Sequence, residues 1–280
     1  MRKNRIAMVC LGIIVIYTLG AIYGEAVYQY YQAIDQTPFY KLTNLDLAYQ
    51  PPSSEHWMGT DALGRDVAAR LIQGTRIAYK VGIITALIAI PIGVFLGCLA
   101  GYFGGRVDDF IVWLYSTFAS IPGLLFILAI AMVVGRGLTG VYLGIGLTTW
   151  VGICRLIRGE VIKHKEQAYV QAAHTLGLSW PRILFRHILP NVFHIIIVTF
   201  TLRFPAAVST EVFMSFLGIG VQNDPSWGIM INSARMRLWQ GVWWEMTFVT
   251  LAIFLLVLAF NLLGDALRDA LDPRLRTEGN

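Results

Sequence analysis

The side chains that could perform chemistry are dispersed along this 280-residue sequence. The histidines stand apart, and no H-E-x-x-H pattern or paired cysteine spacing gathers metal ligands. There is no G-x-x-x-x-G-K-[ST] phosphate-binding loop and no serine, histidine and carboxylate signature. The glycines of "GCLAGYFGG" at 97–105 indicate close helix packing rather than phosphate binding. The sequence therefore predicts no enzymatic activity, no metal site and no cofactor in this chain.

Two charged residues, Arg203 and Glu211, stand inside one long apolar run, "VTFTLRFPAAVSTEVFMSF" at 198–216. A charge at membrane depth is costly, and such residues usually have a polar role. Glu211 could hydrogen-bond a neighbouring helix or subunit, or it could face a pathway, and Arg203 could pair within a helix bundle. Together they are a candidate intramembrane polar site. Pro122 and Pro205 are candidate helix kinks.

The elements that position these residues are apolar helices. The chain is 56% hydrophobic and 14% charged, whereas soluble domains carry about 25% charged residues. A bilayer core is crossed by a helix of about 20 apolar residues, and alternating β-barrel segments are not evident. The sequence therefore predicts an all-α polytopic membrane protein with six transmembrane helices. The expected spans are 6–24, 77–102, 110–134, 138–157, 192–215 and 244–264.

The distribution of lysine and arginine predicts how these spans are oriented. With the N-terminus inside, most basic residues between the spans lie inside, as the positive-inside rule requires. This distribution accounts for the net charge of +5 without nucleic-acid binding. The sequence has no basic stripe with interleaved aromatics that would indicate such binding. The first apolar run is long for a signal peptide, which favours an uncleaved span. Both termini are expected inside, that is, cytoplasmic.

Three parts follow from this topology. We expect a first helix with an outer loop (1–76), a five-helix core (77–264) with a cytoplasmic loop at 158–191, and a cytoplasmic tail (265–280).

The stretch "QAAHTLGLSWPRILFRHILP" at 171–190 is the most structured part of the inside loop. Helix-favouring residues begin near Glu166, and Gly177 suits a left-handed C-terminal turn. Ser179 could cap a second short helix, which Pro190 is expected to end. On these residues alone, the stretch is either a solvated loop or a small-residue helix that presses into a partner.

The same stretch resembles the E-A-A loop of ABC-importer membrane subunits, in which E-A-A is followed at fixed spacing by G and by I-x-L-P. The positions here are Gln171, Ala172, Ala173, Gly177, Leu189 and Pro190. Gln171 replaces the glutamate and His187 replaces the isoleucine, while the spacing is intact. In that family the loop docks in a cleft of a separate ATPase subunit, so the resemblance implies a coupling role for these residues.

Further motifs resemble the peptide/opine/nickel branch of these importers, and most closely its C-type dipeptide and oligopeptide permeases. They are "GTDALGRDVAARLIQGTR" at 59–76, "AGYFGGRVDD" at 100–109, "FLGIGVQNDPSWGIMI" at 216–231 and "NLLGDALRDALDPRLR" at 261–276. Within the first of them, Asp61, Arg65 and Asp66 are compatible with a structural cluster at the outer end of the second span.

The resemblance implies a type I importer fold and half of a translocation pathway for peptides in the inner membrane of a bacterium. It also implies a homologous permease partner, two ATPase subunits that bind ATP and Mg²⁺, and an extracytoplasmic substrate-binding protein. Nickel chelates, opines and oligosaccharides remain alternative substrates. A stand-alone secondary transporter is a less favoured alternative. It would require charged coupling sites near the bilayer midplane, and Arg203 and Glu211 are weak candidates for such sites. A non-transport scaffold is a further alternative.

Overall fold

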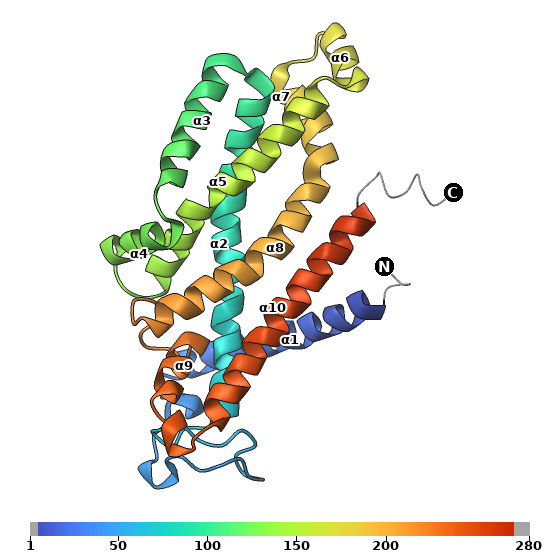
Figure 1. The fold of residues 1–280 in the computed structure, drawn as a ribbon. Helices are drawn as coiled ribbons and strands as arrows, with labels where there is room; N and C mark the ends of the chain where they lie inside the picture. The colour runs from blue at the N-terminus through green and yellow to red at the C-terminus, as the bar shows by residue number, and fades with distance from the viewer. Residues whose placement is uncertain (1–4, 272–280) are drawn as a thin grey trace.

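The computed structural model describes residues 5–271, which form an elongated bundle of helices (Figure 1). In chain order the α-helices are α1 (Arg5–Ala33), α2 (Val67–Phe103), α3 (Gly105–Ser120), α4 (Gly123–Val134), α5 (Leu138–Lys165), α6 (Ala168–Thr175), α7 (Trp180–Arg182), α8 (Leu189–Phe216), α9 (Trp227–Arg235) and α10 (Trp244–Leu271). A π-helical segment, Ile183–Ile188, joins α7 to α8. Short 3₁₀ turns lie at Phe39–Lys41, Leu45–Leu47 and Leu238–Gln240.

The predicted all-α fold with apolar spans is confirmed. Five helices of the described chain are long and apolar enough to cross a membrane, and α3 with α4 makes a sixth, broken span. The two halves of that span meet at 88°. Proline disfavours helical geometry in the residue before it, and Ile121, before Pro122, has an extended ψ of 130°. The expected kink at Pro122 is therefore a corner, and the third span is not the continuous helix that the sequence predicted.

The helices are longer than the predicted spans. Helix α2 begins at Val67, because the Asp66 side chain accepts a hydrogen bond from the Ala69 amide at 2.8 Å and caps its first turn. Helix α5 continues to Lys165, through the first residues of the expected loop. Helix α10 runs to Leu271 without a separate tail helix, and residues 272–280 of the predicted tail lie outside the described residues. Apolar runs mark only the part of each helix that lies in hydrocarbon.

The prediction that Pro190 ends a short loop helix is wrong. Helix α7, the π-helical segment and α8 form one helical stretch, Trp180–Phe216. Proline inside a helix removes one hydrogen bond and brings its ring against the carbonyl four residues earlier. The wider π turn directly before Pro190 gives that ring room. In the same turn, the Asn191 side chain donates to the His187 carbonyl oxygen at 2.6 Å.

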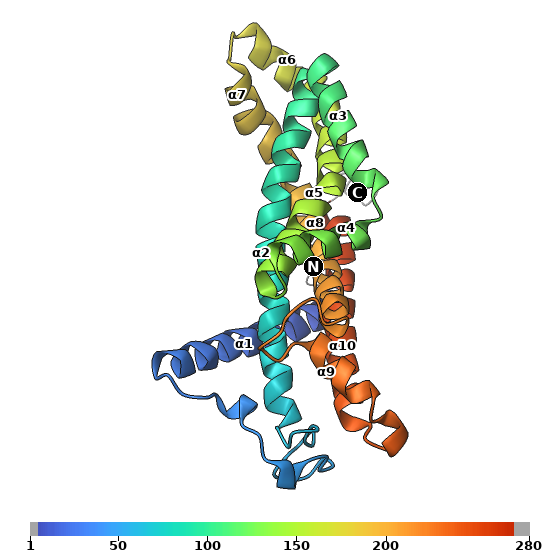
Figure 2. The same cartoon turned by 90° about the vertical axis from the view of Figure 1, so that its left-hand side faces the viewer.

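Helices α2 and α5 pack closely along the centre of the molecule, with α8 beside them (Figures 1 and 2). Gly93, Gly97 and Gly101 lie on the α2 face that meets α5. A Cβ at these positions would lie 2.6 Å from the Ile153 Cβ, 2.7 Å from the Cys154 carbonyl oxygen and 2.8 Å from the Arg158 carbonyl oxygen, respectively. Gly97 and Gly101 therefore serve the close backbone approach that the sequence predicted, whereas Gly104 and Gly105 of the same stretch have nothing near a Cβ.

Helix α1 crosses α2 at a steep angle and extends beyond the bundle (Figure 2). The Tyr17 hydroxyl donates to the Ala252 carbonyl oxygen at 2.9 Å, which ties α1 to α10. Cys10 near the start of α1 packs with Ala259 and Leu263 near the end of α10. The described beginning of α1 and end of α10 therefore lie together, on the side toward α6.

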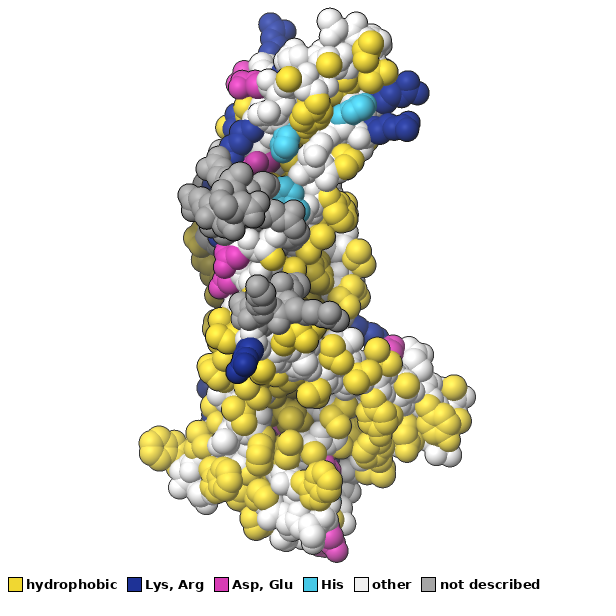
Figure 3. All heavy atoms as spheres, turned by 90° about the vertical axis from the view of Figure 1, so that its right-hand side faces the viewer, with side chains coloured by type: hydrophobic (Ala, Val, Ile, Leu, Met, Phe, Trp, Pro, Cys, Tyr) yellow, Lys and Arg dark blue, Asp and Glu magenta, His cyan; other side chains and the backbone are white. Residues whose placement is uncertain are grey.

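The surface separates into two zones. Hydrophobic side chains cover most of the face seen in Figure 3, whereas lysine, arginine and histidine side chains gather near the end that carries α6 and α7. We call this the α6 end, and the opposite end, which carries α9 and the 34–66 loop, the α9 end. A broad apolar belt beside a charged end is the distribution expected of a chain embedded in a bilayer.

Candidate functional site

The α6 end carries the stretch at 171–190. Helix α6 ends in a Schellman motif, in which the Gly177 amide donates to the His174 carbonyl oxygen at 2.9 Å and the Leu178 amide donates to that of Ala173 at 3.2 Å. This motif requires a left-handed residue, and Gly177 has φ +73°. Ser179 occupies the N-cap position of α7 as predicted, but its side chain makes no capping hydrogen bond. The turn therefore depends on Gly177.

The α6 residues divide into an inward and an outward face. Val170 and Ala173 are buried against the bundle, whereas Gln171, Ala172 and Leu176 are exposed. Leu176, which is 80% exposed, is a large apolar side chain at the tip of the turn. Small and apolar side chains on an outward helix face are suited to close contact with another protein.

Gln171, the first departure from the family pattern, bonds inside the chain. Its Nε2 donates to the Lys165 carbonyl oxygen at 3.2 Å and so satisfies a group at the end of α5. A carboxylate has no proton to donate at neutral pH and could not make this bond. His187, the second departure, lies partly buried in the π-helical segment. Of the remaining motif positions, Pro190 is exposed and Leu189 is partly buried.

The stretch at 171–190 packs against the C-terminal end of α2. The Tyr102 hydroxyl and His174 Nε2 lie 3.2 Å apart with their rings stacked, and the Phe103 and Trp180 rings meet edge to face. Ile183 and other buried residues of the π-helical segment join the same hydrophobic core as α2 and α5. Packed side chains therefore connect α6 and α7 to the end of α2.

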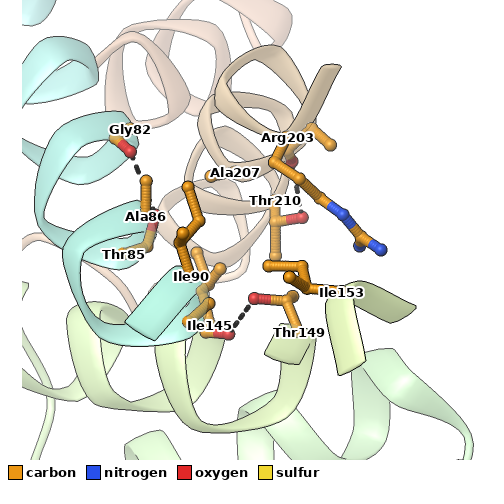
Figure 4. A pocket seen from close by; sticks show the side chains of 12 residues that line it. Gly82, Thr85, Ala86, Ile90, Ile145, Thr149, Ile153, Arg203, Ala207 and Thr210 are labelled. Atoms are coloured by element: carbon orange, nitrogen blue, oxygen red, sulfur yellow. Dashed lines mark hydrogen bonds between the residues drawn. The ribbon is translucent and has the colours of Figure 1, made fainter. Parts of the chain in front are cut away.

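A second candidate region lies midway along α8, around Arg203. A hollow between α2, α5 and α8 is lined mostly by small and threonine side chains (Figure 4). Arg203 stands at its rim, and its guanidinium extends along α5 past Ile153 (Figure 4). Within residues 5–271, Arg203 has no ion pair or hydrogen bond, so the intrachain partner that the sequence suggested is not found.

Glu211 lies apart from Arg203 and serves a different contact. It is 1% exposed, and the Ser215 hydroxyl donates to its Oε1 at 2.6 Å. The Ser215 oxygen in turn accepts the Val221 amide at 3.0 Å. Glu211 thus anchors the connection between α8 and α9 to α8. The predicted polar site consists of two unconnected residues, of which only Arg203 borders a hollow.

At the α9 end the three residues of the predicted outer cluster lie together. Asp61 is buried and pairs with Arg65 at 2.8 Å and with Arg70 at 3.3 Å. Asp66, besides capping α2, lies 2.8 Å from His56 Nδ1. These contacts fold the loop before α2 onto the helix.

A neighbouring ion-pair network was missed by sequence reasoning. Asp224 pairs at 2.7 Å with both Arg76 and Lys41, and Glu25 lies 2.7 Å from Lys80 and 3.7 Å from Arg76. Burial raises the pKa of Asp224, but the hydrogen bonds from Lys41 and Arg76 lower it by more, so that its pKa lies below the ordinary value. The available signal was the position of Arg76 and Glu25 beside predicted spans, where charges seek partners.

Comparisons with known proteins agree with this architecture. A family model described as "Binding-protein-dependent transport system inner membrane component" matches residues 93–277, and one described as "N-terminal TM domain of oligopeptide transport permease C" matches residues 1–52. The dipeptide transport system permease protein DppC of Bacillus subtilis (strain 168) is 40% identical over 99% of this chain and 84% of its own length. The glutathione transport system permease protein GsiD of Pectobacterium atrosepticum is 39% identical over 89% of this chain and 82% of its own length.

Two solved structures share the fold. A chain of the inward-facing MetNI methionine ABC transporter has a TM-score of 0.57 and 16% identity, covering 72% of this chain and 96% of that one. A chain of an amino acid ABC transporter has a TM-score of 0.55 and 14% identity, covering 71% of this chain and 92% of that one.

Proposed function

This chain belongs to the family of binding-protein-dependent transport system inner membrane components, and we propose that it is a permease subunit of an ATP-driven peptide importer. Relatives named as dipeptide, oligopeptide and glutathione permeases support peptides as the substrate class. The chain forms half of the pathway, and a homologous permease subunit forms the other half. It lies in the inner membrane of a bacterium, with both termini and the α6 end in the cytoplasm.

The observation that carries the coupling role is the exposed outer face of α6 beside the Gly177 turn. Gln171, Ala172 and Leu176 are exposed there, while the inner face of the same helix is packed onto the core. We assign this face to docking of an ATPase subunit. Gly177, Leu189 and Pro190 shape the segment, and Ala173 seats it on the bundle.

In this proposal ATP and Mg²⁺ bind to two such partner subunits, as the resemblance to ABC importers implies. An extracytoplasmic binding protein delivers peptide at the α9 end. Closure of the ATPase subunits moves α6 and α7, and the contacts of Tyr102 with His174 and of Phe103 with Trp180 pass that motion to α2.

Replacement of Gly177 by valine tests the coupling role. A β-branched residue is strained at φ +73°, at a cost of about 1–2 kcal/mol or more, so the Schellman turn is lost. In proteoliposomes that contain the complete transporter, we expect ATP-dependent uptake of peptide to fall at least about tenfold, since 1.4 kcal/mol is a factor of ten.

Gly241→Val is the matched control. Gly241 also has a left-handed φ, +81°, with nothing near a Cβ, but it lies at the α9 end. We expect its variant to keep both uptake and bound ATPase subunits. If the Gly177→Val transporter retains both, the α6 end does not couple ATP hydrolysis to transport.

A further inference from the structure

Arg203 places a full positive charge near the midpoint of α8. The helix spans Leu189–Phe216, 28 residues, so at 1.5 Å per residue about 20 Å of helix lie on each side of it. The Arg203 backbone therefore lies near the middle of α8, inside the expected span 192–215. Charged side chains at that depth are costly, and they pair with another group or mark a pathway.

Several other arginines near the spans have partners inside the chain. Arg76 pairs with Asp224, and Arg158 makes two bonds to Asp108 at 2.5 and 2.6 Å. Arg155 lies over the Tyr115 ring. By contrast, no ion pair, hydrogen bond or aromatic ring is found for Arg203 anywhere in residues 5–271. Its side chain is only partly buried, so a group from outside the chain can reach it.

The side chains around the Arg203 guanidinium leave it free to bind a group from outside the chain. Gly152 on α5 gives it space, since a Cβ there would collide with Nη2 of Arg203. Three threonines of the hollow turn their protons to their own helices. Thr85 donates to Val81, Thr149 donates to Ile145 and Thr210 donates to Ala206, at 2.7–2.8 Å. Figure 4 draws the bonds of Thr149 and Thr210.

The remaining wall is made of small and apolar side chains, and Arg203 is the one charged residue among those that line the hollow. A peptide passing such a wall meets few hydrogen-bonding groups that would hold its backbone. Its charged ends are the parts that this region can distinguish.

We propose that Arg203 contacts the C-terminal carboxylate of the peptide as the peptide passes the face of the chain that carries this hollow. This inference rests on the proposed function. A guanidinium presents parallel N–H donors that match the two oxygens of a carboxylate, and it stays charged at any physiological pH. The same charge repels the N-terminal ammonium. Arg203 thus favours peptides with a free carboxyl terminus and orients them relative to α8.

Equilibrium binding of two probes to the assembled permease–ATPase complex in nanodiscs tests this proposal without the binding protein. The probes are radiolabelled trialanine and trialanine amide, which differ only in the carboxylate. We expect the wild-type complex to bind trialanine about tenfold more tightly than the amide, as a charge-assisted contact provides. Arg203→Gln should remove this preference. Arg203→Lys should retain part of the preference, because lysine keeps the positive charge but lacks the parallel N–H donors of the guanidinium.

Arg136→Gln is the control for loss of one positive charge, because Arg136 is exposed in the connection between α4 and α5. It should leave the preference intact. Equal binding of the two probes to the wild type, no binding of either, or an unchanged preference in Arg203→Gln would overturn the proposal. If Arg203→Gln does not assemble, the uncharged variant Arg203→Met takes its place, and an unchanged preference in that variant overturns the proposal. ATP-driven uptake of trialanine by the wild type, with its binding protein, tests the proposed function separately.

Discussion

The two ends of the molecule differ in how their charged side chains are paired, although both expose large apolar side chains, such as Trp239 at the α9 end. At the α9 end, buried charges such as Asp61 and Arg76 meet opposite charges of the same chain. At the α6 end, large apolar side chains such as Leu176 and Trp180 are exposed, and Arg182 and Arg186 have no ion pair within the described residues. A closed network holds its own shape, whereas an exposed apolar and basic surface gains stability from a partner. The α9 end is held together by ion pairs within the chain, and the α6 end is the face that we assign to docking of an ATPase subunit.

Asp61→Ala should have the largest effect on this contrast. It leaves the buried Arg70 without its nearest carboxylate, and loss of one partner from a buried pair costs about 3–5 kcal/mol. We expect a large fall in the thermal unfolding temperature of the purified chain in detergent. Asp109→Asn, at an exposed position on α3, should leave it nearly unchanged. Equal unfolding temperatures for the wild type and Asp61→Ala would mean that the α9 end is not held by its buried charges.

Asp224→Asn should have an intermediate effect that depends on pH. The lost bonds to Arg76 and Lys41 correspond to about 2 kcal/mol at pH 7. Because the folded pKa of Asp224 is depressed, its contribution is full above the ordinary aspartate pKa of about 4 and is lost as the pH falls through the lower folded value.

The measurement is the difference in unfolding free energy between the wild type and Asp224→Asn along a pH series. The difference should be largest at neutral pH and shrink below about pH 4. A difference that stays constant over the whole series would show that the ion pairs around Asp224 do not stabilise the α9 end.

Gln171→Glu should have the smallest effect. It removes the bond to the Lys165 carbonyl oxygen, an exposed contact that contributes about 1 kcal/mol or less. We expect a slight fall in the unfolding temperature of the chain and nearly normal ATP-driven uptake, because α6 keeps its packed inner face. Loss of uptake with normal stability would show instead that Gln171 acts directly at the interface with the ATPase.

The sequence predicted the helices well where one local cause decides the structure. Five of the six long apolar runs are continuous helices, and Gly177 makes the left-handed turn that its position after α6 suggested. Pro122 was expected to kink the remaining run and instead breaks it into two helices. Pro190 does not break its helix, because the π turn before it absorbs the same steric conflict, and nothing in the local residue types distinguishes these two outcomes.

Residue pairing was harder to predict, because it depends on how distant segments meet. Arg76 and Asp224 are 148 positions apart, and their ion pair exists only because the connection before α9 folds back onto α2. Arg203 and Glu211 share one helix, so the sequence grouped them, yet they face different surroundings. Hydrophobic periodicity places residues in elements, whereas tertiary packing decides which of them meet.

Helix α2 is a single 37-residue element that runs between the two ends. Asp66 caps it beside the buried charges, and Tyr102 and Phe103 near its other terminus touch the α6 end. At 1.5 Å per residue it is about 55 Å long. If such a rod tilts by about 10° around the glycine contacts with α5, which lie near its Tyr102 terminus, the Asp66 terminus swings by about 8 Å and the other terminus by about 2 Å in the opposite direction. Opening at one face of the membrane and closing at the other are then a single rigid-body tilt of this helix.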